Sequence, residues 1–151
     1  MTFTSSEKNK AKRHVMRAVE PYLVNSGFVK LKNNEFSIRI GNDQRGSLLV
    51  YLPLRSEYYR LQTAFSNESG KLIVGPHSDP YGCPNSPNNK RYNFRLFRFH
   101  EDTYQRCAEN IIEWIGDVAL PWLQSMPEME WCEGGHIPLP WPNQEAARGL
   151  R

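Results

Sequence analysis

The sequence lacks several features that mark common protein classes. No apolar run approaches the roughly 18 residues that a membrane-spanning helix needs, because the longest candidate, residues 111–123, is interrupted by Glu113 and Asp117. The basic N-terminus is not followed by the apolar segment of a secretory signal. We therefore expect a cytoplasmic protein that has no contact with a membrane.

Cysteine is also scarce. The chain has three cysteines in 151 residues, and no two of them are spaced CxxC. A chain of this length can form a core of its own, so a disulfide framework is not expected. We predict free thiols, with Cys107 as a small apolar residue of the core.

The common catalytic signatures are missing as well. The sequence contains no GxSxG, no HExxH, no Walker A motif and no GxGxxG, which are the local patterns of several large enzyme classes. These absences favour a non-enzymatic protein, and we expect no cofactor.

The composition is that of an ordinary globular protein. Hydrophobic residues make up 39% of the chain and charged residues 23%, and the net charge is +3. This length and composition predict a single domain over residues 1–151. Basic residues gather in 1–17 and 90–98, and acidic residues in 101–117.

Hydrophobic periodicity predicts a helix at each end of the domain. The first helix is expected to begin at Glu7, after a flexible arm over 1–6, with Ser5 or Ser6 as its cap. Pro21 should kink it or end it near Val19, and Gly27 is a left-handed stop. The second helix is expected to begin after Asp102 as N-cap and to end or kink at Pro121.

Alternating apolar residues between the helices predict strands. They occupy 28–32 and 35–40 as a hairpin, then 47–54, 58–66, 71–75 and 92–100. The order of elements predicts an α+β fold, in which an antiparallel sheet of about five strands carries both helices on one face. An extended, proline-rich tail is expected over 127–151.

The segment between His77 and Arg91 is a candidate site for a small metal- or cysteine-dependent enzyme. It places His77, Asp79 and Cys83 within seven positions. Zinc takes four ligands, or three and a water, and the segment supplies three at most. A polar surface loop whose side chains bond to their own backbone is the favoured interpretation, and the enzyme stays an alternative.

A second alternative is a nucleic-acid-associated protein. Arginines alternate with aromatic residues in 91–99, where basic side chains on a strand can follow phosphates while rings stack on bases. The first helix is basic too. The same aromatic residues also fit the core of a sheet. The candidate contacts are Arg91, Arg95 and Arg98.

The leading hypothesis comes from a resemblance. A helix that ends in EPYLVNSGFVK, a short hairpin, further strands and a late helix that runs into LPWL resemble the small bacterial cytosolic α+β domains found among polymorphic-toxin immunity proteins. The residues that carry the resemblance are Gly27, Phe28, Lys30, Phe36, Pro121, Trp122 and Leu123.

The resemblance implies a binding protein that neutralises another protein by covering its active surface, and it implies no catalytic residues. Partner binding is assigned to the acidic face of the second helix, whose charge suits a basic partner. Its residues are Glu109, Glu113 and Asp117, with Trp114 as an exposed aromatic anchor. The oligomeric state is left open.

Overall fold

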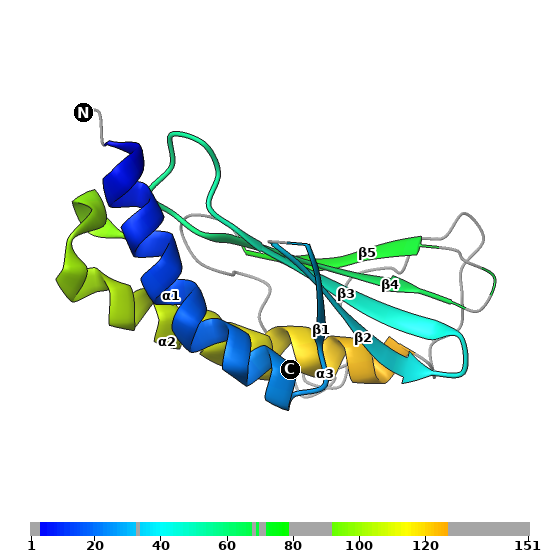
Figure 1. The fold of residues 1–151 in the computed structure, drawn as a ribbon. Helices are drawn as coiled ribbons and strands as arrows, with labels where there is room; N and C mark the ends of the chain where they lie inside the picture. Colours follow the sequence, from blue (N-terminus) through cyan, green and yellow to red (C-terminus); the bar gives the residue numbers. More distant parts are fainter. Residues whose placement is uncertain (1–3, 33, 68, 70–71, 79–91, 127–151) are drawn as a thin grey trace, which may run out of the picture.

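A computed structural model of the chain describes residues 4–32, 34–67, 69, 72–78 and 92–126 (Figure 1). It confirms the α+β fold: a helix precedes a five-stranded antiparallel sheet, and a helical segment follows it. The strands are β1 (Val29–Lys32), β2 (Glu35–Gly41), β3 (Gln44–Tyr51), β4 (Arg60–Ser66) and β5 (Leu72–His77), and they pair in the order in which they occur along the chain. The tail, 127–151, lies outside the described residues.

The first helix, α1 (Ser5–Asn25), begins two residues earlier than expected. Thr4 is its N-cap: the Glu7 amide donates to Thr4 Oγ1 at 3.1 Å, and the Thr4 amide donates to Glu7 Oε1 at 3.3 Å. This reciprocal pair is a capping box. It draws residues 4–6, which were expected in the flexible arm, into the N-terminus of the helix.

Pro21 does not end α1 near Val19, which was one of the two expected effects of this proline. A proline in a helix removes one backbone donor and crowds the carbonyl four residues earlier. Val19 and Leu23, on either side of Pro21, are both completely buried against the core, and their packing holds the helix together as far as Asn25. Gly27 then has a φ of 102°, which confirms the left-handed stop.

Residues 92–100 do not form the predicted strand. They make one isolated bridge, between Arg95 and Tyr58, and then the short 3-10 turns η1 (Phe97–Phe99) and η2 (Glu101–Thr103). Arg98 and Phe99 both have left-handed φ angles, of 50° and 53°. Two such residues in succession turn the chain out of an extended path, so the segment covers the end of the core.

The C-terminal helical segment is continuous through Pro121. It comprises α2 (Tyr104–Trp114), the π-helical turn η3 (Ile115–Ala119) and α3 (Leu120–Ser125). In η3 the Leu120 amide bonds to Ile115 O, one residue farther back than in an α-helix. This wider turn directly precedes Pro121, where an α-helix would crowd the proline ring against the carbonyl four residues earlier. The predicted Asp102 cap is also wrong, since η2 leads directly into α2.

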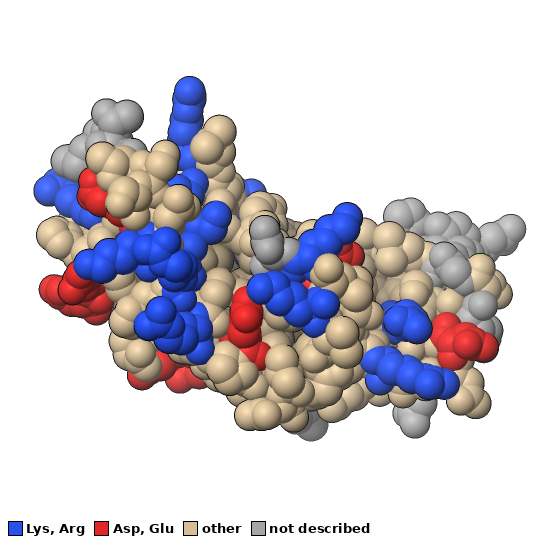
Figure 2. Space-filling view, in the orientation of Figure 1, with Lys and Arg blue, Asp and Glu red and all other residues tan. Residues whose placement is uncertain are grey.

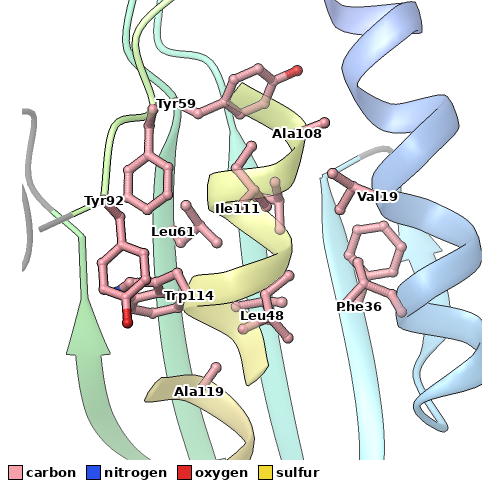
Figure 3. Close-up of a cluster of buried hydrophobic side chains, with 14 of the residues drawn as sticks. Val19, Phe36, Leu48, Tyr59, Leu61, Tyr92, Ala108, Ile111, Trp114 and Ala119 are labelled. Carbon is pink, nitrogen blue, oxygen red and sulfur yellow. The ribbon is translucent and has the colours of Figure 1, made fainter. Parts of the chain in front are cut away.

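The helices lie together on one face of the sheet, as predicted (Figure 1). Phe36 lies beside Val19 of α1, while Leu48 and Leu61 face Ile111 and Trp114 of α2 (Figure 3). α3 comes closest to the sheet at two glycines of the strands, Gly46 on β3 and Gly75 on β5. A Cβ on Gly75 would lie 2.5 Å from the Trp122 ring, and one on Gly46 would lie 2.7 Å from Leu123. The core therefore fills the space between one sheet face and the helices.

The core also holds a phenol that makes no hydrogen bond to any described residue. Tyr59 is almost completely buried, its hydroxyl has no partner within the described part of the chain, and burial raises its pKa well above the usual range. Tyr104 is buried too, but its hydroxyl donates to Phe99 O at 3.1 Å. The two tyrosines differ in whether the hydroxyl contributes to stability.

We expect Tyr59→Phe to leave the free energy of unfolding unchanged or to raise it by about 1 kcal/mol, because an unpaired buried hydroxyl costs free energy. Tyr104→Phe is the matched control, and it should lose about 1 kcal/mol with its hydrogen bond. Urea unfolding measures both. A loss for Tyr59→Phe as large as that for Tyr104→Phe would show that the Tyr59 hydroxyl has a partner.

Candidate protein-binding surface

The acidic surface expected on the second helix lacks its aromatic anchor. Trp114 is 0% exposed, so the assignment of an exposed binding residue to this position is wrong. The spacing along α2 explains the error. Trp114 follows Cys107 by seven residues and Ile111 by three, which places it on the same buried face.

The acidic residues themselves lie at the surface. Glu109 accepts a hydrogen bond from Gln105 at 3.0 Å, and Glu113 is exposed. Asp117, in the π-helical turn, accepts a hydrogen bond from the Tyr92 hydroxyl at 2.8 Å. Asp117 therefore also ties residue 92 to the helical segment, so part of this acidic helix face has a structural role.

Replacing Trp114 tests its place in the core. We expect Trp114→Ala to lower the free energy of unfolding by about 3–5 kcal/mol, as for other buried aromatic residues. Glu109→Ala, on the exposed face of the same helix, should change it by less than about 0.5 kcal/mol. Chemical denaturation of both variants makes the comparison, and a Trp114→Ala protein as stable as the Glu109→Ala protein would return Trp114 to the surface.

The arginines of the nucleic-acid alternative do not form a strand array. Arg95 Nε donates to Glu57 Oε2 at 2.8 Å, an interaction that raises the pKa of the arginine. Its guanidinium lies 4.7 Å from the centroid of the Phe97 ring, and that of Arg98 lies 5.3 Å from it. Such cation–π contacts fix the turn η1, so Arg95 attaches this segment to the loop before β4. Arg91 lies outside the described residues.

The metal and cysteine alternative is represented by one described residue. His77 is exposed at the end of β5, opposite Gln62, while Asp79 and Cys83 lie outside the described residues. Where the structure describes the chain, no three His, Cys, Asp or Glu side chains are grouped as a metal site would require. The described cysteine, Cys107, is free and completely buried, which confirms its expected place in the core.

Burial raises the pKa of the Cys107 thiol from 9.0 to about 12. The folded state therefore holds this proton more tightly than the unfolded state. The resulting stabilisation is present below pH 9 and is lost as the pH rises from 9 toward 12. At neutral pH the thiol is neutral and shielded from alkylating reagents.

We expect iodoacetamide at pH 8 to leave Cys107 unmodified in the folded protein and to modify it in urea. Peptide mass mapping separates its peptide from those of Cys83 and Cys132. Modification of Cys107 without denaturant, at the rate of a free thiol, would contradict its burial.

The face of the sheet opposite the helices carries a different set of side chains. Side chains of successive residues in a strand point to opposite faces, and a Cβ built on Gly46 or Gly75 would point toward α3. Their neighbours Arg45, Ser47 and Val74 therefore point away from the helices. We call the surface that these residues share with their cross-strand partners the open face. It comprises Val29, Lys32, Glu35, Ser37, Arg39, Arg45, Ser47, Leu49, Tyr51, Arg60, Gln62, Ala64, Ser66, Leu72, Val74 and His77.

Small side chains form the middle of the open face. One cross-strand row runs over all five strands as Val29, Ser37, Ser47, Ala64 and Val74. The serines and the alanine are buried or half-buried, whereas the two valines at the ends are 63% and 66% exposed. The row is thus a low floor with an aliphatic side chain at each edge of the sheet.

Larger side chains flank this floor on both sides. The next row in one direction is Arg39, Arg45, Ser66 and Leu72, and the next in the other includes Leu49 and His77. Leu72 is 59% exposed and Leu49 is 37% exposed. The open face therefore combines exposed aliphatic residues with basic ones.

A signal for this surface is present in the sequence. Leu48, Leu49 and Val50 are consecutive, and so are Leu72, Ile73 and Val74. A sheet that contacts a core on one face only should alternate between apolar and polar residues, and continuous apolar runs indicate that both faces make contacts.

No protein-family model, curated protein or solved structure matches the chain. In the part of the chain that the structure describes, no helix has the length and apolar character needed to cross a bilayer.

Proposed function

We propose that this protein is a non-enzymatic protein-binding domain and that its partner contacts the open face. The observation that carries the proposal is the exposure of Val29, Leu49, Leu72 and Val74 on one sheet face. All described helices pack against the other face. Leu72 and Val74 lie on β5, Leu49 lies on β3 and Val29 lies on β1, so a partner that covers the floor would contact all four.

The free energy gained by burying these four side chains is large enough for specific binding. Complete burial of one Val or Leu side chain contributes about 1.5–3 kcal/mol. Since these four side chains are already partly covered, a partner that buries the rest gains about 4 kcal/mol, which corresponds to about a thousandfold in affinity. The polar and charged residues of the open face then add specificity.

The resemblance to immunity-type domains supports the same class of function. Proteins of that kind act by covering a partner's surface, and a rigid sheet with one face available suits that role. The binding surface in this proposal is the sheet and not the acidic face of α2, because Trp114 belongs to the core.

Affinity capture with matched valine variants tests the proposal. Val29→Thr/Val74→Thr makes the two ends of the floor polar and keeps the β-branched shape that strands favour. Val24→Thr is the control, since Val24 is an exposed valine on α1, away from the open face. We expect the wild-type and control proteins to retain one partner protein and the double variant to retain about tenfold less.

The capture is repeated with nuclease, and urea unfolding confirms that the variants are folded. Equal retention by the double variant and the control would show that the open face is not the binding surface. Retention that disappears with nuclease would show that the bound molecule is nucleic acid.

A further inference from the structure

The open face carries three arginines that make no hydrogen bond or ion pair within the described residues. They are Arg39, Arg45 and Arg60, and all are exposed. The open face also carries Lys32 and Glu35, which are direct cross-strand partners and whose opposite charges cancel. The charge of the open face that remains uncompensated is therefore positive.

Two of these arginines face one another. Arg39 and Arg45 are direct cross-strand partners in the β2–β3 hairpin, so their Cβ atoms lie about 5 Å apart. Like charges in this position destabilise a sheet. An anionic group that binds both guanidinium groups removes the repulsion, so the pair gains more from an anion than two separate arginines would.

We propose, on the basis of the proposed function, that the partner presents an acidic surface to the open face. Carboxylates of the partner contact Arg39 and Arg45, and an adjacent apolar side chain lies on the floor between Val29 and Val74. The planar guanidinium group forms two parallel hydrogen bonds to a carboxylate. The row of the two arginines directly flanks the floor, which places the charged and apolar contacts side by side.

The neighbouring side chains favour an acidic protein over nucleic acid. Proteins that bind single-stranded nucleic acid stack aromatic side chains on the bases. Of the described residues on the open face, the ring-bearing ones are Tyr51, half-buried at the end of β3, and His77 at the end of β5, and neither lies in the floor or in the row of Arg39 and Arg45. The floor is aliphatic and small, which fits apolar side chains of a protein. The proposed partner is therefore acidic, whereas the acidic face of the second helix had led us to expect a basic partner.

A charge-reversal pair with a matched control tests the inference. Arg39→Glu/Arg45→Glu reverses the two facing residues. Arg13→Glu/Arg17→Glu makes the same change in net charge at exposed positions of α1, within the basic residues that gather along this helix (Figure 2). The binding constant of each folded variant is measured for the partner protein that the wild-type chain retains.

We expect Arg39→Glu/Arg45→Glu to weaken binding at least tenfold and Arg13→Glu/Arg17→Glu to weaken it less than threefold, at physiological salt. Arg39→Lys/Arg45→Lys provides the direct chemical probe, because carbodiimide then couples the introduced amines to carboxylates in contact with them. The cross-links should lead to Asp or Glu residues of the partner.

The outcomes separate the two proposals. If both charge reversals weaken binding equally, or no cross-link to a carboxylate forms, the acidic contact is wrong, while the loss of binding in Val29→Thr/Val74→Thr still supports the proposed function. If a 20-residue poly-dT strand competes with the partner for the open face, the site binds nucleic acid. A wild-type chain that retains no protein overturns both proposals.

Discussion

The contact of Trp122 with the backbone of Gly75 determines how the two layers of this protein meet. No side chain separates the indole from β5, since a Cβ at Gly75 would lie 2.5 Å from the ring and 2.7 Å from Thr63 Oγ1. Leu123 approaches Gly46 of β3 in the same way. These close approaches fix which face of the sheet belongs to the helices. Because side chains alternate along a strand, they also fix the residues of the open face.

The two faces differ in chemistry as a result. The helix-covered face receives large apolar residues such as Phe36, Leu48 and Phe65, all completely buried. The open face receives small residues in its middle, aliphatic residues around them and, beside them, arginines that pair with no described residue. Four of the exposed large apolar residues, Val29, Leu49, Leu72 and Val74, share this one face of the sheet. This asymmetry is why the proposed function is assigned to the sheet.

Local sequence signals predicted part of the fold well. The hairpin strands, the left-handed Gly27 and the burial of Cys107 follow from alternation, backbone freedom and residue size. The capping box of Thr4 and Glu7 was equally local, and it explains the early start of α1. The segment 92–100 could not be predicted in this way. It has the alternation of a strand, but the left-handed Arg98 and Phe99 and the ion pair of Arg95 with Glu57 depend on tertiary contacts. The open face likewise requires the register of five strands, which no single stretch of sequence contains.

Binding of a partner to the sheet requires that the open face is accessible in the isolated protein. Hydroxyl-radical footprinting of the free chain measures this accessibility directly, because oxidation of aliphatic side chains follows their exposure. We predict that Leu49, Leu72 and Val74 are oxidised while their strand neighbours Leu48, Val50 and Ile73 are protected. Equal protection of both sets would show that the open face is already covered and is not a binding surface.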